Sequence, residues 1–201
     1  LWGWLRPAPA QPVSRFGIAF PDSQLPRGFV ELTADGSRLV YEGPHDSAGS
    51  QLWVKDRERP EATPIPGTEN AGGFTLSPDG RWIAFAVNGK LKKMPVSGGT
   101  ATPLADSAFF SGTAWLDDGT IVYTSSRFKL MRVSAAGGPS TELVDLADSQ
   151  RLAVLPTRLP RGRGVLFTAC GGVCEEADLW VYDLDSGKAR RLVPGALRGW
   201  Y

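Results

Sequence analysis

The run His45-Asp46-Ser47 brings the three residue types of a Ser–His–Asp hydrolase into one short stretch of the chain. A triad works because a base lies beside the nucleophile and a carboxylate orients that base, an arrangement made in space rather than along the sequence. Adjacent residues on one loop do not provide this geometry, and the sequence contains no Gly-x-Ser-x-Gly elbow. We therefore expect a polar hairpin loop at this point and no catalytic residue in the chain.

The sulfur and imidazole ligands that a metal could use are few: Cys170, Cys174 and the single histidine His45. A structural zinc site takes about four such ligands, and the acidic turns at 116–119 and 183–187 are too short to indicate a calcium loop. We expect no metal and no cofactor. The gap between the two cysteines spans a glycine-containing turn, which permits a disulfide if their Cα atoms come within about 7 Å. Such a disulfide would fit an oxidising compartment.

The turn Ser77-Pro78-Asp79-Gly80 attracts attention as a possible carboxylate site, but it recurs. Each copy precedes an alternating apolar strand, and the glycines are 44, 39 and 43 residues apart. The positions that share this role are Asp35 and Gly36, Asp79 and Gly80, Asp118 and Gly119, and Gly162 after Arg161. Proline presets φ, aspartate bonds the local backbone and glycine takes the left-handed conformation. The recurrence predicts a structural turn rather than a catalytic or binding carboxylate.

A second repeat marks the strands that follow. Leu52, Leu91, Leu130 and Leu179 are each followed 13 positions later by an aliphatic residue, namely Ile65, Leu104, Leu143 and Leu192. Units of about 40 residues with four short antiparallel strands are typical of β-propeller blades. The prediction is an all-β chain with four such blades, at about 28–66, 72–105, 110–146 and 152–194.

The ends of the chain carry further expectations. Residues 1–13 read as a linker, in which Trp2 and Trp4 beside Arg6 fit either the interfacial end of a membrane helix or an ordinary apolar terminus. We expect a lone strand at 14–20 and the first strand of another blade at 197–201, so that 14–201 forms the propeller part. Four blades are about two-thirds of a six-bladed ring. Further blades or self-association are then needed to cover the exposed blade flanks.

Charge excludes one class of partner. The chain has 22 basic and 21 acidic residues and a net charge of +1, so no strong field attracts nucleic acid, and none is expected as a partner. Two basic groups alternate with apolar residues and are interpreted as solvated strand faces; they are Lys90, Lys92 and Lys93, and Arg158, Arg161 and Arg163. No apolar run approaches the roughly 20 residues of a membrane span.

The run from Ser77 to Phe85, "SPDGRWIAF", resembles the repeat signature of TolB-type, WD40-like propellers. With "RFGIAFP", "ATPIPGTENAGG", "TAWLDDGTIVY" and "LPRGRGVLFT" in order, the chain resembles the propeller found C-terminal to bacterial transmembrane serine/threonine protein kinases. The resemblance implies a six-bladed propeller outside the cytoplasmic membrane, tethered by a membrane helix to a kinase. The chain departs from the pattern at Arg161 and Asp117, and it contains no kinase sequence element.

A binding face follows from propeller topology. Loops between blades, and between the second and third strands of a blade, gather on one face around the channel mouth. In this sequence they contribute His45, Asp46, Phe109, Phe110, Arg127, Phe128, Arg151 and Trp200. Exposed aromatic and arginine side chains there would be recognition residues, whereas buried ones would wedge neighbouring blades together. For Phe109, Phe110 and Trp200 the wedge role is favoured.

Three functions fit these observations. The first is a non-catalytic sensor or interaction domain of a receptor-type kinase, bound by an unknown ligand or protein at the channel mouth. The second is the substrate-gating propeller of a serine peptidase of the prolyl-oligopeptidase type. The third is a periplasmic envelope scaffold of the TolB kind. An upstream kinase and membrane helix in the parent gene would favour the first, and a downstream hydrolase domain the second.

Overall fold

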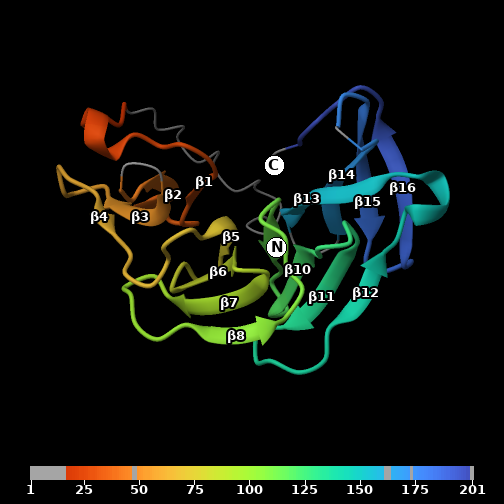
Figure 1. Cartoon of the computed structure of the whole chain (residues 1–201), viewed down its shortest axis with the longest axis horizontal. Helices are drawn as coiled ribbons and strands as arrows, with labels where there is room; N and C mark the ends of the chain where they lie inside the picture. The colour runs from red at the N-terminus through yellow and green to blue at the C-terminus, as the bar shows by residue number, and fades with distance from the viewer. Residues whose placement is uncertain (1–16, 47–48, 161–163, 173, 200–201) are drawn as a thin grey trace, which may run out of the picture.

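Four small β-sheets follow one another around an arc in the computed structural model of the chain (Figure 1). The structure describes residues 17–46, 49–160, 164–172 and 174–199. Within these residues every sheet has four antiparallel strands in sequence order, and short 3₁₀ turns occur at η2 (Asp22–Gln24) and η3 (Ala147–Ser149). This architecture confirms the predicted all-β propeller blades.

Each blade runs from an innermost to an outermost strand without a crossover. The first blade holds β1 (Val30–Leu32), β2 (Arg38–Pro44), β3 (Ser50–Asp56) and β4 (Thr63–Pro64), and the second holds β5 (Gly72–Leu76), β6 (Trp82–Val87), β7 (Lys90–Pro95) and β8 (Thr102–Ala105). The third holds β9 (Thr113–Trp115), β10 (Thr120–Thr124), β11 (Leu130–Ser134) and β12 (Thr141–Val144), and the fourth holds β13 (Leu152–Arg158), β14 (Gly164–Cys170), β15 (Ala177–Asp183) and β16 (Lys188–Val193).

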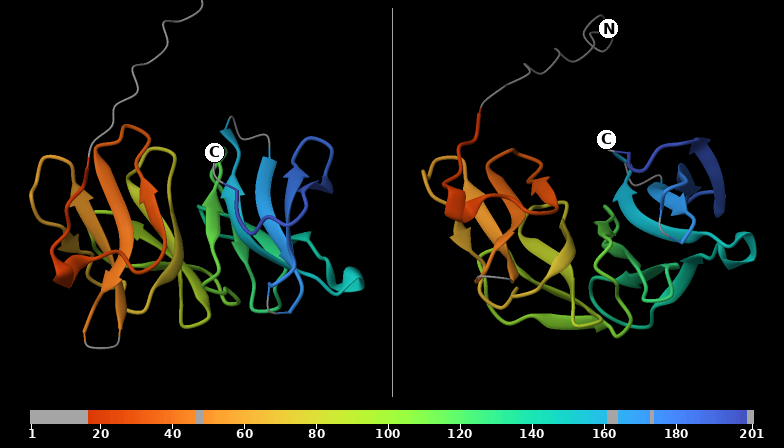
Figure 2. Two further views of the ribbon diagram at one scale, coloured as in Figure 1. Left: turned by 90° about the horizontal axis from the view of Figure 1, so that it is seen from above. Right: turned by 45° about the horizontal axis from the view of Figure 1, so that its top comes forward.

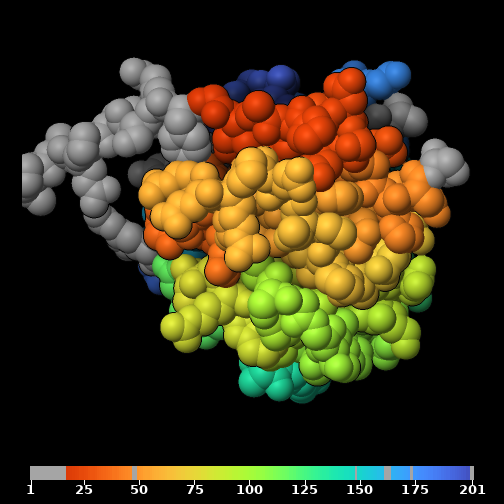
Figure 3. All heavy atoms as spheres, turned by 90° about the vertical axis from the view of Figure 1, so that its left-hand side faces the viewer, coloured from red at the N-terminus to blue at the C-terminus, as the bar shows by residue number. Residues whose placement is uncertain are grey.

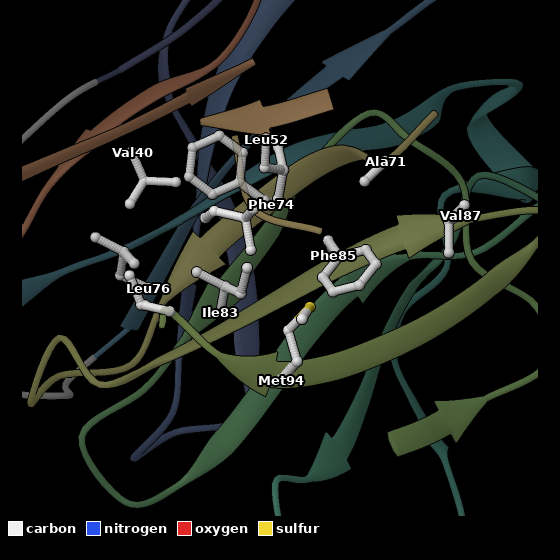
Figure 4. Close-up of a cluster of buried hydrophobic side chains, with 11 residues drawn as sticks. Val40, Leu52, Ala71, Phe74, Leu76, Ile83, Phe85, Val87 and Met94 are labelled. Carbon is white, nitrogen blue, oxygen red and sulfur yellow. The ribbon is translucent and has the colours of Figure 1, made fainter. Parts of the chain in front are cut away.

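Strand β6 shows how alternation builds the stack of blades. Ile83 and Phe85 pack into the core shared with the first blade, whereas Ala84 and Ala86 pack into the core shared with the third. All four side chains are buried, because successive residues of a strand point to opposite faces and both faces are covered here. Figure 4 shows the first of these cores, in which Phe74, Phe85 and neighbouring aliphatic side chains meet.

The turns before the second strands form as their sequence predicts. Ser77 Oγ donates to Asp79 Oδ1 at 2.5 Å, the N–H of Arg81 donates to the same oxygen at 3.1 Å, and Gly80 has a φ of +67°. Asp35 and Asp118 accept equivalent bonds from the backbone two residues later. These aspartates therefore serve their own turns. Gly162 lies outside the described residues.

The outer flank of the first blade is covered by the chain that precedes it. Phe20 packs edge-on against the buried Tyr41 with ring centroids 5.1 Å apart, and the Gln24 side chain accepts a hydrogen bond from the N–H of Ala62. Figure 3 shows this red segment lying along the orange strands of the first blade. The flank is not sealed, because Ile18, Leu25 and Leu32 remain exposed.

The expected lone strand at 14–20 does not form in its described part. Residues 17–20 pair with no strand, since among the described residues no last blade offers them an edge, and Phe20 packs on a blade flank instead. Residues 14–16, and the linker expected at 1–13, lie outside the described part. Residues 197–199 likewise form no strand, and the end of the predicted strand at 197–201 is not described.

The segment 194–199 covers part of the flank of the fourth blade. The N–H of Gly195 donates to Asp178 Oδ1 at 3.1 Å, and the hydroxyl of Thr168 donates to the carbonyl of Leu197. A Cβ on Gly199 would lie 2.8 Å from Leu179, so the backbone approaches the sheet closely there. The exposed Leu192, Val193 and Leu197 show that this flank, too, is only partly covered.

Candidate interaction face and central cavity

The interblade connections and the loops between second and third strands lie on one face of the molecule. This placement follows from the antiparallel order, since each blade begins and ends on the same side. In the left view of Figure 2 the strands run between two ends, and the loops after β2 and β14 lie at the same end. We call this end, formed in the described residues by 45–46, 49, 65–71, 88–89, 106–112, 125–129, 145–151, 171–172 and 174–176, the loop face.

Three phenylalanines form a cluster on the loop face. The rings of Phe109 and Phe110 have centroids 4.1 Å apart, and Phe128 lies edge-on to Phe109 at 4.8 Å. Phe110 is 62% exposed, whereas Phe109 and Phe128 are half-buried. The inner two rings thus support the outer one, and Phe110 presents an aromatic surface to solvent.

Backbone contacts fix this aromatic cluster to the third and fourth blades. The N–H of Phe109 donates to the carbonyl of Thr124 at 2.8 Å, and the carbonyl of Phe128 accepts from the N–H of Ala153, also at 2.8 Å. Phe128 itself has a φ of +57°, which is uncommon for a residue with a side chain. The strain is offset by the bonds that hold the loop, so the aromatic cluster is positioned rather than loose.

Gly73, at the start of the second blade, lets the connection between the second and third blades pack closely against strand β5. It has a φ of +58°, and an added Cβ would lie 2.4 Å from the carbonyl oxygen of Phe110. The hydroxyl of Thr113 donates to the carbonyl of Gly73 at 2.7 Å, which ties the third blade to the same point. The glycine is therefore required by close backbone packing beneath Phe110.

The polar residues expected on the loop face are dispersed and mostly engaged. His45 Nδ1 lies 3.0 Å from Gln51 Oε1, and Asp46 accepts from the N–H of Gly49 at 2.7 Å, both within the first blade. Arg151 forms an ion pair with Asp178 at 3.0 Å in the fourth blade. Arg127 is exposed beside the aromatic cluster. Of the predicted set, the structure brings together only Phe109, Phe110 and Phe128, with Arg127 adjacent in sequence; Trp200 lies outside the described residues.

The predicted triad residue types do not converge. Ser47 lies outside the described residues, and His45 and Asp46 make separate contacts in their own loop. No group of three or more potential metal-binding side chains occurs among the residues that the structure describes. Cys170 and Cys174 are joined by a disulfide with their Cα atoms 4.7 Å apart, which closes the loop tip of the fourth blade.

A central cavity of about 530 Å³ lies where the innermost strands meet. Its walls come from β1, β5, β9 and β13, with Asp117 and Arg198 added from the connections that follow. The apolar part of the wall includes Phe29, Leu32 and Pro156. The cavity therefore joins residues of all four blades.

Glu31 is the acidic group most strongly perturbed in this cavity. Its Oε2 accepts from the N–H of Leu76 at 3.1 Å and its Oε1 from the hydroxyl of Thr75 at 3.3 Å. Burial raises the pKa of Glu31 to about 7, against the opposing effects of these hydrogen bonds and of Arg158 and Arg198. A carboxyl group that exchanges its proton near neutral pH thus faces the cavity.

Two arginines bring positive charge to the cavity wall. Arg158 Nη1 forms an ion pair with Asp117 at 3.2 Å. The guanidinium of Arg198 lies 4.5 Å from the centroid of the Phe29 ring, and desolvation lowers the pKa of Arg198 while Glu42 and Glu31 oppose that shift. Arg158 is the last residue of β13, an innermost strand, and it lines the cavity with its side chain 35% exposed.

Sequence reasoning missed Glu31, Arg158 and Arg198 as residues of the cavity wall. One signal was available: Glu31 stands four residues before its turn aspartate, where the other blades have Thr75, Ala114 and Thr157. A charged residue at an innermost position that is otherwise small or neutral marks a departure from the repeat. Such departures at the channel indicate function more than the repeated turns do.

No protein-family model matches the sequence, and no curated protein matches it either. Solved structures match well. TolB from Acinetobacter baumannii superposes with a TM-score of 0.69 at 16% identity, over 84% of this chain and 43% of that one. The putative TolB from Agrobacterium tumefaciens superposes with a TM-score of 0.67 at 18% identity, over 83% of this chain and 66% of that one. A prolyl endopeptidase structure superposes with a TM-score of 0.55 at 16% identity, over 80% of this chain and 28% of that one.

The chain has the fold of TolB-type, WD40-like β-propellers. It spans less than two thirds of the length of each TolB structure. Because the sequence identities are below 20%, these matches show only that the fold is shared. Among the described residues there is no helix with the length and apolar character required to cross a membrane.

Proposed function

We propose that this chain is a non-catalytic, extracytoplasmic propeller that recognises a ligand or protein through its loop face, as the sensor domain of a bacterial receptor-type serine/threonine kinase. Contact at the loop face would bias the association state of the parent receptor and thereby the kinase. The kinase connection rests on the sequence resemblance described above. The extracytoplasmic location is supported by the disulfide in the fourth blade and is compatible with the fold shared with TolB.

The exposed ring of Phe110 carries this proposal. Phe110 is 62% exposed at the tip of a cluster of three rings, and aromatic anchors dominate interface energies, so this ring offers a partner an apolar contact surface. The rings of Phe109 and Phe128 hold it in place, so little conformational entropy is lost when a partner binds. The exposure also argues against a purely structural wedge role for this residue.

The resemblance to a prolyl endopeptidase favours a second candidate, a propeller that gates access to a separate hydrolase domain. In that case the parent gene would encode a hydrolase domain after the propeller. A kinase domain and a membrane helix before the propeller would support the sensor instead. A cleavable signal peptide without a kinase would support an envelope scaffold with the same fold.

The functional test uses the parent receptor in its membrane. Phe110→Ser should change autophosphorylation in intact cells by several-fold, because it removes the exposed anchor without disturbing a core. Trp82→Ser is the matched control, since Trp82 is also partly exposed but begins β6 at the end opposite the loop face. Equal effects of the two changes, or no effect of Phe110→Ser, would count against the proposal.

A further inference from the structure

The disulfide of the fourth blade lies on the loop face, next to the innermost ring of the aromatic cluster. Cys170 is the last residue of β14 and is fully buried, whereas Cys174 lies in the loop that follows and is half-buried. Cys174 and Phe128 both pack against one small apolar core, which is formed by Val154, Cys170 and Ala177. The packing of Phe128 therefore includes the disulfide and its surroundings.

We propose that Cys174 is a site of thiol–disulfide exchange with a dithiol, and that reduction of the disulfide loosens the support of Phe110 through Phe128. The inference rests on the proposed function only in taking Phe110 as the contact residue of the loop face. The exchange reaction itself requires no partner at that face.

The two sulfur atoms differ in their access to solvent. Cys174 lines a pocket of about 620 Å³ together with Arg151 and Leu197, whereas Cys170 has no exposed surface. The rate of thiol–disulfide exchange depends on which sulfur is attacked and on the access to it. We therefore expect the incoming thiolate to bond to Sγ of Cys174, with Cys170 as the leaving group.

The exchange is a two-electron reduction of the disulfide by the dithiol. The first thiolate of the reductant forms a bond to Cys174 Sγ while the bond between Cys170 and Cys174 breaks. The second thiolate of the reductant then attacks the mixed disulfide and releases Cys174. The two protons of the dithiol end on Cys170 and Cys174 by way of solvent, and the reductant leaves as its own disulfide.

Other contacts hold β14 and β15 in place when the disulfide is reduced. Arg151 Nη2 donates to the carbonyls of Ala169 at 3.1 Å and Glu176 at 3.4 Å. Its Nη1 forms an ion pair with Asp178 at 3.0 Å, and the two strands are paired along their length. Reduction should therefore free the tip of the loop without unfolding the blade.

Cys174 has a backbone conformation that favours release of the loop. Its φ is +56°, in the left-handed region that is uncommon for a residue with a side chain. Such a conformation persists only while surrounding contacts impose it. Here they are the bond to Cys170 and the hydrogen bond from the N–H of Cys174 to the carbonyl of Gly171 at 2.8 Å. Loss of the first should let Cys174 withdraw from the small apolar core.

Packed side chains connect this core to Phe110. Phe128 packs on the core that contains Cys170, and its ring lies edge-on to Phe109 at 4.8 Å. Phe109 lies beside Phe110, with ring centroids 4.1 Å apart. The carbonyl of Phe128 is fixed by the N–H of Ala153, so reduction should change the motion of the rings rather than displace the backbone.

The test compares fluorine NMR spectra of the full chain, labelled with fluorinated phenylalanine, before and after reduction with excess dithiothreitol in native buffer. Single leucine substitutions assign the signals. We expect the signals of Phe109, Phe110 and Phe128 to move, or to change in width by roughly twofold. Phe74, in the core between the first two blades, should be unaffected. Unchanged signals of the aromatic cluster, an equal change at Phe74, or a disulfide that resists dithiothreitol would overturn the inference.

Trapping identifies the sulfur that is attacked. A limiting amount of the monothiol cysteamine forms a mixed disulfide, iodoacetamide alkylates the thiol that is released, and fragmentation mass spectrometry locates both groups. We expect cysteamine on Cys174 and the alkyl group on Cys170 at least about ten times as often as the reverse. Equal amounts of the two products would contradict the assignment to Cys174.

Two variants separate the disulfide from the rest of the fourth blade. The Cys170→Ala, Cys174→Ala double variant should show the aromatic signals of the reduced chain and should not respond to dithiothreitol. Arg191→Gln is the matched control, because it removes a partly exposed ion pair with Asp178 in the same blade and should leave those signals unchanged. A double variant with the signals of the oxidised chain would show that the disulfide does not support Phe128.

The two proposals fail separately. If the aromatic signals respond to reduction but Phe110→Ser leaves receptor activity unchanged, the loop-face proposal is wrong and the exchange site stands. If Phe110→Ser alters receptor activity while the aromatic signals ignore reduction, the inference about the disulfide alone is wrong.

Discussion

The side chain of Glu31 crosses the boundary between the first two blades and accepts the backbone N–H of Leu76 at 3.1 Å. A second carboxylate, Glu42, does the same for the N–H of Gly73 at 2.9 Å. Both donors belong to β5, an innermost strand with a neighbour on one side only. The acidic side chains therefore satisfy backbone donors that no strand pairs, and they tie the blades together at the channel.

Stability should depend on the protonation of Glu31. The folded-state pKa is raised from 4.5 to about 7, so the stabilising contribution is fully present below 4.5 and is lost as the pH rises through 7. A shift of this size corresponds to at most about 3 kcal/mol, and the partial exposure of Glu31 reduces that to roughly 1–2 kcal/mol. Glu31→Gln should flatten the decline in the free energy of unfolding between pH 5 and pH 8, as measured with urea.

Glu58→Gln serves as the control for this experiment, because Glu58 is exposed on the first blade and away from β5. It should leave the decline unchanged. If Glu31→Gln and Glu58→Gln show the same pH dependence as the unaltered chain, Glu31 does not titrate as described.

Gly73→Ala should destabilise the second and third blades. The new Cβ would lie 2.4 Å from the carbonyl oxygen of Phe110, and the positive φ would be strained, at a cost of roughly 2 kcal/mol. The melting temperature should fall by about 5 °C. Gly171→Ala is the matched control, because nothing lies within 4 Å of its added Cβ. Similar melting temperatures for the two variants would argue against close packing at Gly73.

Asp79→Ala should cost stability and leave recognition intact. Two hydrogen bonds to Asp79 Oδ1 hold the turn, and their loss should cost about 1 kcal/mol. These bonds lower the pKa of Asp79, so its contribution is present above 3.8 and is lost as the pH falls through the folded-state value. An Asp79→Ala protein of unchanged stability that had lost receptor signalling would show that the turn is a functional site after all.

Removal of the disulfide should have a local effect. Cys170 and Cys174 close a loop of only a few residues, for which the chain-entropy model gives about 2 kcal/mol. The Cys170→Ala, Cys174→Ala double variant should therefore unfold at lower urea concentration but keep its four blades by circular dichroism. Reducing agent should lower the stability of the unaltered chain and leave the double variant unchanged; an equal response of both would place the effect elsewhere.

The repeats made the blades predictable. Asp79 and Gly80 recur because every blade needs the same turn, and Leu52 and Ile65 recur because every blade buries the same strand positions. Equal spacing therefore reports the fold. It does not predict Glu31, which breaks the repeat, or Arg198, which follows β16 and reaches the same cavity wall only in the folded chain.

The loop face was predictable in part. Topology places Phe110 and Phe128 on one face, but their distance depends on the positive φ of Phe128 and on the fit of Gly73 beneath the connection. The wedge role favoured for Phe110 from sequence overlooked the support that Phe109 and Phe128 give to an exposed ring. Exposure is a tertiary property, and no local pattern encodes it.

We expect the exposed ring of Phe110 to bring the loop face into contact with a partner. The most direct measurement places a photoreactive amino acid at position 110 of the parent protein in intact cells, and at position 82 in a parallel strain. We expect a discrete crosslinked species from position 110 that the position 82 strain lacks. Crosslinking of equal yield and pattern from the two positions, or none from position 110, would contradict it.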